Sequence, residues 1–276
     1  MYKRSIKLNR TYLLPFTYGV KYFNSDEIEQ GSGTLMVINE DGYVLTCKHV
    51  AELFIQADRL NEEYPELLKE LKEDREGTIK KYNLDDNTVV LTTIILTITY
   101  NKAAITFHDT LDLALIHFEN VKFDCEYYPI FSRSLVEIGQ SVCKLGFAFP
   151  EYDCFEYSKK DKAIVLKENP VTNFPLFPLD GIVTRYEENE SGFEMSTPGI
   201  KGQSGGPIFS PDGIVYGIQS MTQVFDMNAE LDIKVKRGIK IRSERYNPFI
   251  GLGIGVSSTE ICKFLDENKV KYRSVE

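Results

Sequence analysis

The stretch GQSGGPIFS, residues 202–210, sets one serine among three glycines directly before an apolar run. Glycines let the backbone turn sharply, so that several main-chain N–H groups can converge on one point beside the serine hydroxyl. A tight turn that leads into a strand has the same composition. Two interpretations are therefore open: a plain turn, or a turn that holds Ser204 as an activated nucleophile.

An activated serine needs a base that accepts its proton and an acid that holds the base in the right tautomer. The chain contains three histidines, His49, His108 and His117. His49 lies in LTCKHVAE (45–52), after an apolar run that reads as a strand, so its side chain can face a cleft at the strand end. His117 lies inside an apolar run and His108 lies just after one. Taken alone, each of the three is more often a structural histidine than a catalyst. The spacing to the other motifs separates His49 from the rest and makes it the candidate base.

The candidate acid is Asp112, which opens the apolar run LALIHF (113–118). A carboxylate at the start of a buried strand is costly unless a partner such as an imidazole N–H stabilises its charge. The alternative is an aspartate that caps a turn, a role for which the neighbouring Asp109 is suited. Because the apolar strand continues directly from Asp112, we favour Asp112 as the acid.

Taken in chain order, LTCKHVAE, DLALI and GQSGGPIF resemble the three catalytic motifs of trypsin-like serine peptidases, which have the chymotrypsin double-barrel fold. Within that superfamily the chain is most similar to the bacterial HtrA type, through GSGTLMVINEDGYVLTCKHV (31–50) and GLGIGVSSTEICKFL (251–265). The resemblance covers roughly residues 16–268 in motif order. HtrA-type proteins usually carry a PDZ domain after the protease, and we expect none here.

The resemblance implies a serine endopeptidase that works through an acyl-enzyme, without metal or cofactor. It assigns His49 as general base and later general acid, Asp112 as the group that orients it, and Ser204 as the nucleophile. Backbone N–H groups of the nucleophile loop are expected to form the oxyanion hole: Gly202, Gln203 and Ser204.

The resemblance also implies where a protein or peptide substrate binds. Its main chain is expected to add to the edge of the strand after the nucleophile loop. Where trypsin has an acid in its first pocket, this chain has Pro198, so a preference for Arg or Lys is not indicated. Two glycines are expected to leave room there for a medium or large apolar side chain. The predicted substrate-binding residues are Pro198, Gly199, Gln219, Ser220, Met221 and Gly253.

The composition indicates an all-β fold, because 12% of the residues are aromatic and none is tryptophan, a mix that suits sheet faces. Many short apolar runs separated by turn residues fall into two groups. We predict two six-stranded antiparallel β-barrels, with boundaries at 1–125 for the barrel of His49 and Asp112 and 126–276 for that of Ser204. A helical insertion at about 52–82 and a terminal helix at 259–268 complete the expected fold.

Charge and hydropathy exclude several classes of partner. The net charge of −9 disfavours nucleic acid, and no stretch of 18 apolar residues could cross a membrane. Five cysteines without CxxC pairing indicate free thiols in a reducing compartment and no zinc site. Residues 1–23 read as a first strand rather than a secretory signal, so a cytoplasmic location is expected, with export as the alternative.

Two segments exceed what a minimal peptidase needs, the insertion at 52–82 and a polar excursion at 222–248. Solvated decoration of the surface is the simpler interpretation of each. The functional interpretation is a docking surface for a regulatory protein, or a lid beside the active site.

Overall fold

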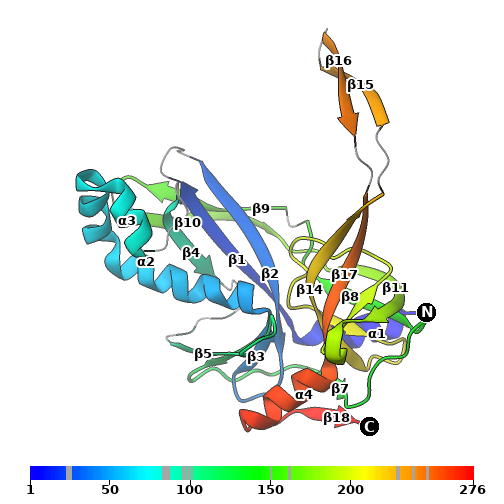
Figure 1. Ribbon diagram of the computed structural model, residues 1–276. Coiled ribbons are helices and arrows are strands. Elements are labelled where there is room, and N and C mark those ends of the chain that lie inside the picture. The colour runs from blue at the N-terminus through cyan, green and yellow to red at the C-terminus, as the bar shows by residue number, and fades with distance from the viewer. Residues whose placement is uncertain are drawn as a thin grey trace.

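The computed structural model describes residues 1–22, 27–82, 88–94, 98, 100, 102–149, 151–160, 163–227, 231–237, 240–246 and 249–276. Two β-sheets form the body, with a pair of helices beside the first sheet and a long β-arm projecting from the second (Figure 1). The strands of the first sheet lie within residues 13–118 and those of the second within 130–275. The domain boundary at residues 125 and 126 stays a prediction.

The first sheet has six strands, and every neighbouring pair is antiparallel. Asp41 and Gly42 form the predicted hairpin turn, in which Gly42 adopts a φ of +91° and the Ile38 N–H donates to the Tyr43 carbonyl at 2.8 Å. The order of the strands is β4 (Thr88–Ile94), β1 (Leu13–Tyr22), β2 (Ile28–Val37), β3 (Tyr43–Thr46), β6 (Ala114–Phe118) and β5 (Ala103–Phe107).

The second sheet closes into a six-stranded barrel, because its first strand also pairs with its sixth. Apolar side chains from its strands form a separate core that includes Val142, Val183 and Phe193. The barrel strands are, in order, β13 (Pro207–Phe209), β8 (Ser141–Gly146), β11 (Phe177–Tyr186), β12 (Gly192–Met195), β17 (Phe249–Ser257) and β14 (Val215–Asp226). Two short parallel strands, β7 (Ile130–Ser132) and β18 (Arg273–Val275), extend it beyond β14. The predicted β-barrel fold is confirmed.

The helical insertion consists of two helices, α2 (Lys48–Glu73) and α3 (Arg75–Tyr82). The first of these helices, α2, begins at Lys48, whereas the insertion was predicted to begin at about residue 52. His49 therefore lies in the first turn of α2 and not at the end of a strand. Asp74 ends α2, and its carboxylate accepts the Gly77 N–H at 3.0 Å at the start of α3.

Two segments that read as loops are β-hairpins. β9 (Glu151–Ser158) pairs with β10 (Ala163–Asn173), and two residues of β9, Cys154 and Phe155, are buried. The excursion at 222–248 is the β-arm: β14 and β17 run past the barrel edge, and β15 (Leu231–Arg237) pairs with β16 (Lys240–Tyr246) at its tip (Figure 1). Their exposed polar residues resemble loop composition, whereas main-chain pairing decides the structure.

Helices at both ends of the chain pack on the body. The chain starts with α1 (Lys3–Asn9) and η1 (Arg10–Tyr12), and η2 (Glu188–Glu190) precedes β12. The terminal helix is α4 (Ser258–Glu267), within one residue of the prediction. No helix in the described part of the chain is long and apolar enough to cross a membrane.

One apolar core runs through both sheets and fixes them against each other. It contains Leu35 and Leu45 from the first sheet, Leu145 and Phe209 from the second, and Phe264 from α4. Burial of large side chains such as these stabilises a fold by about 1.5–3 kcal/mol each. The loops that carry the candidate residues are therefore held by a shared core.

Candidate active site

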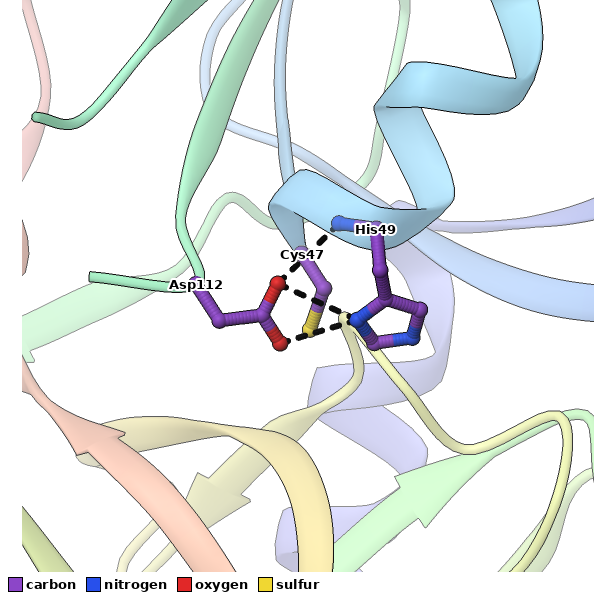
Figure 2. Close-up of side chains that lie close together, drawn as sticks. All are labelled: Cys47, His49 and Asp112. Atoms are coloured by element: carbon purple, nitrogen blue, oxygen red, sulfur yellow. Dashed lines mark hydrogen bonds and ion pairs between the residues drawn. The ribbon is translucent and has the colours of Figure 1, made fainter. Parts of the chain in front are cut away.

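His49 and Asp112 are in direct contact, as Figure 2 shows. The His49 Nδ1 lies 2.9 Å from Asp112 Oδ2 and 3.1 Å from Oδ1, and the His49 backbone N–H donates to Oδ1 at 3.0 Å. The N-terminus of α2 supplies that N–H, one of the four that lack an acceptor within a helix. Since an ionised carboxylate only accepts hydrogen bonds, Nδ1 carries a proton, so Nε2 is the acceptor whenever the ring is neutral.

Asp112 is held as a carboxylate. Burial alone would raise the pKa of Asp112, but hydrogen bonds from His49 and Ser220 outweigh it and lower this pKa to about 2. Ser220 Oγ donates to Oδ2, the same oxygen that lies closest to the imidazole. Asp112 thus stays charged at every pH at which an imidazole can be neutral.

Cys47 lies beside this pair, and Cys47, His49 and Asp112 offer donor atoms within 4.8 Å of one another (Figure 2). The thiol is fully buried and donates to the Gln219 carbonyl at 3.2 Å. Burial, together with the nearby Asp112 charge, raises the pKa of Cys47 well above its usual value. A thiol held protonated is a poor metal ligand, so this arrangement fits a positioned histidine better than a metal centre.

Ser204 lies on the predicted glycine turn and reaches Asp112 through one intermediate residue. Its hydroxyl donates to the Ser220 carbonyl at 3.3 Å, and Ser220 in turn bonds Asp112. Among the hydrogen bonds of the described residues, none joins His49 to Ser204. Catalytic hydrogen bonds are often long in structures without substrate and tighten when it binds.

Thr34 of β2 anchors the nucleophile loop to the first sheet. Its hydroxyl donates to the Gly202 carbonyl at 2.8 Å and its backbone N–H donates to the Ser204 carbonyl at 2.9 Å. The Phe147 N–H donates to the same hydroxyl at 3.2 Å. Both loop carbonyls therefore face the protein interior.

Residues 200–203 form a turn with the pattern of type II. The Gln203 N–H donates to the Ile200 carbonyl at 2.9 Å, and Gly202 has a φ of +97°. The Gln203 N–H is thus occupied, which corrects its prediction as an oxyanion donor. Within the part of the chain that the structure describes, the N–H groups of Gly202 and Ser204 donate to no protein acceptor.

A pocket of about 160 Å³ opens beside Ser204. Four of the predicted substrate-binding residues line it, whereas the other two, Pro198 and Gly253, do not. Its lining residues are Gly199, Ile200, Lys201, Ser204, Gln219, Ser220, Met221 and Thr222.

The strand edge next to this pocket is open from Ser220 onward. Gln219 has its main chain fully paired, because Gly205 N–H donates to its carbonyl and its N–H donates to Gly206. Its predicted main-chain contact with substrate is therefore wrong. Beyond Gln219, β14 pairs only with β17 among the described strands, so no described strand covers its other edge at Ser220 and Met221. The side chains of Ser204 and Gln219 donate to the carbonyls of these two residues.

Sequence reasoning missed Lys144 of β8, which is fully buried beneath this region. Its Nζ donates to the carbonyls of Thr197 and Pro198 at 2.8 and 2.5 Å. The only local signal is a lysine inside the apolar run SVCKLGFAF (141–149).

Thr34→Val is expected to lower the free energy of unfolding by about 2–4 kcal/mol, because the buried Gly202 carbonyl and Phe147 N–H each lose a partner. Urea titration would measure it as a lower midpoint with an unchanged m-value. Thr106→Val is the matched control, since Thr106 is exposed on β5 of the same sheet. A loss below 1 kcal/mol would contradict the anchoring role of the Thr34 hydroxyl.

A family model described as a trypsin-like peptidase domain matches residues 31–218. The matched range contains His49, Asp112 and Ser204. No curated protein matches the chain closely enough to count as a relative.

Proposed function

Because the chain belongs to the trypsin-like peptidase domain family, we propose that it is a serine endopeptidase that cleaves protein or peptide substrates through an acyl-enzyme. One observation carries the proposal. His49 lies within hydrogen-bond distance of a charged Asp112, which Ser220 links to the hydroxyl of Ser204. A silent peptide-binding module would need none of these three groups in these positions.

In the proposed reaction, His49 Nε2 accepts the Ser204 proton as the serine oxygen attacks the scissile carbonyl carbon. Asp112 holds the ring in the required tautomer and stabilises the imidazolium that forms. The imidazolium then protonates the amine as the C–N bond breaks, which leaves an ester on Ser204. A water molecule, deprotonated by His49, hydrolyses that ester and restores the serine.

The Gly202 and Ser204 N–H groups are the proposed donors to the tetrahedral oxyanion. Their support is twofold: neither has an acceptor among the described residues, and the inward carbonyls of Gly202 and Ser204 are fixed by Thr34. Donors held in place before the reaction need no reorganisation when charge develops. The substrate main chain is proposed to pair with the free edge of β14 at Ser220 and Met221.

We also propose that the two additional segments regulate this activity by docking a protein partner. The insertion at 52–82 is continuous with α2, which carries His49 in its first turn. The arm at 222–248 is continuous with β14, which carries Ser220. A partner that moves either segment would act on residues bonded to Asp112. A likeness to HtrA-type enzymes and a cytoplasmic location remain part of this proposal.

A fluorophosphonate probe is expected to label Ser204 of the wild-type protein, because the reagent reacts with an activated serine. Ser204→Ala should remove the labelled peptide entirely, and His49→Ala should slow labelling at least 100-fold, since general-base catalysis contributes about 10²–10⁴-fold. Intact-protein mass spectrometry gives the readout. Ser134→Ala, which removes an exposed serine before β8, is the control.

Label that persists in Ser204→Ala would sink the proposal. So would a wild-type protein that stays unlabelled with every protein substrate and partner tried, and that outcome would favour a catalytically silent peptide-binding module.

A further inference from the structure

Lys144 is a buried cation without an anionic partner. Its side chain is 0% exposed, and no carboxylate of the described residues lies within ion-pair distance of it. A protonated lysine has three N–H donors, and the Thr197 and Pro198 carbonyls accept two of them. Burying a charge in this way is costly unless something else compensates it.

Lys144 does not itself line the pocket beside Ser204, but its Nζ lies close to the side chain of Gln219, which does. A Cβ added to Gly253 would stand 2.7 Å from Lys144 Nζ and 3.0 Å from Gln219 Oε1. A Cβ added to Gly199, which lines the pocket, would stand 2.5 Å from Gln219 Nε2. The space that these two glycines leave is thus filled by polar side-chain ends. This corrects the prediction that they make room for an apolar side chain.

Gln219 connects the buried lysine to the pocket, which it lines together with Ser204. Its Nε2 donates to the carbonyls of Met221 and Ile254 at 2.7 and 3.2 Å, while its buried Oε1 has no hydrogen-bond partner among the described residues. The uncompensated ammonium of Lys144 is therefore the feature that an anionic ligand would complete, whereas the Oε1 acceptor needs a hydrogen-bond donor.

We propose that this pocket selects a substrate side chain that carries a carboxylate, glutamate or aspartate, on the residue before the cleaved bond, and that Lys144 determines this specificity. The inference rests on the proposed serine endopeptidase. The carboxylate supplies the missing counter-charge, and in a low-dielectric floor that attraction acts over several ångströms without direct contact. A lysine or arginine side chain is repelled, and an apolar one leaves the ammonium uncompensated.

Two sets of peptides that differ only in glutamate or glutamine at this position test the charge, because the two side chains are nearly isosteric. The wild-type protein is expected to show a kcat/KM at least tenfold higher for glutamate than for glutamine. In Lys144→Met this ratio should fall to about one. Damage to the fold would lower both values together and leave the ratio unchanged.

Lys201→Met is the matched control, because Lys201 lines the same pocket but is exposed. Water and salt screen an exposed charge, so the glutamate-to-glutamine ratio should change less than about threefold. A wild-type ratio of one or below, or a ratio that Lys201→Met abolishes and Lys144→Met preserves, would overturn the role of Lys144.

Binding separates this inference from the proposed function. Peptides that end in glutamate or glutamine, the product-like forms, can be titrated calorimetrically into Ser204→Ala, which needs no turnover. Glutamate is expected to bind at least tenfold more tightly, and equal dissociation constants would refute the acidic pocket. Absence of fluorophosphonate labelling together with selective binding of glutamate would sink the endopeptidase alone.

Discussion

Asp112→Asn is expected to lower kcat for peptide hydrolysis about 10⁴-fold, the loss that the equivalent change causes in a Ser-His-Asp peptidase. Asp112 accepts from both the ring and the backbone N–H of His49. An asparagine can turn its NH₂ group toward the ring, which then keeps its proton on Nε2 and cannot accept one from Ser204. Steady-state hydrolysis of a peptide that the wild-type protein cleaves would measure the loss.

Two control variants make the Asp112 result specific. Asp109→Asn removes an exposed aspartate three residues away and should leave kcat unchanged. Ser220→Ala removes only one of the hydrogen bonds to the charged Asp112, which is worth about 1.5–3 kcal/mol, so kcat should fall by roughly 10- to 150-fold, far less than in Asp112→Asn. An Asp112→Asn enzyme that keeps more than a tenth of the wild-type kcat would show that Asp112 does not orient the base.

The proposed catalytic residues could be predicted because each one belongs to a short motif with local causes. Gly202 and Gly205 have φ values of +97° and +86°, so the turn that carries Ser204 depends on its own glycines. Asp112 opens an apolar strand, where an uncompensated carboxylate calls for a partner. The structure brings His49 and Asp112 into contact, whereas the triad as a working unit remains part of the proposal.

Features that depend on distant partners could not be predicted in the same way. Main-chain pairing holds the strands of the β-arm together. Residues such as Val224 and Phe249 are exposed there, so the sequence lacks the alternation of apolar and polar side chains that marks a strand with one buried face. The break between α2 and α3 depends on the Asp74 carboxylate, which accepts the Gly77 N–H, and not on the general preference of glycine for helix ends. The occupied N–H of Gln203 follows from the turn type, which the sequence leaves open.

Lys144 is the clearest case, because its burial depends on segments more than fifty residues away. The Thr197 and Pro198 carbonyls lie over its Nζ, and the backbone of Gly253 approaches it closely. Position 144 could therefore be recognised as unusual from its apolar neighbours, but its place next to Gln219, which lines the pocket, could not. The same burial makes the lysine a strong influence on stability.

The stability of the wild-type protein is expected to rise between pH 7 and pH 9 by about 2 kcal/mol through Lys144 alone. Burial lowers the pKa of Lys144 to about 7. The unfolded chain, with an ordinary lysine pKa near 10.4, binds more protons than the native state throughout this range. Stability therefore increases as pH rises from the folded pKa toward the unfolded one.

Lys144→Met should remove this pH-dependent contribution, so the stability difference between mutant and wild type should itself change by about 2 kcal/mol from pH 7 to pH 9. Urea titrations of both proteins at each pH would measure it. The stability difference between Lys144→Met and wild type at a single pH is less informative, because the mutant also leaves the Pro198 carbonyl without its donor, which costs about 1–3 kcal/mol. Lys201→Met, at an exposed position, should keep the wild-type slope. If Lys144→Met also keeps the wild-type dependence of stability on pH, Lys144 is not desolvated in the native protein, and the proposed selection of an acidic side chain loses its physical basis.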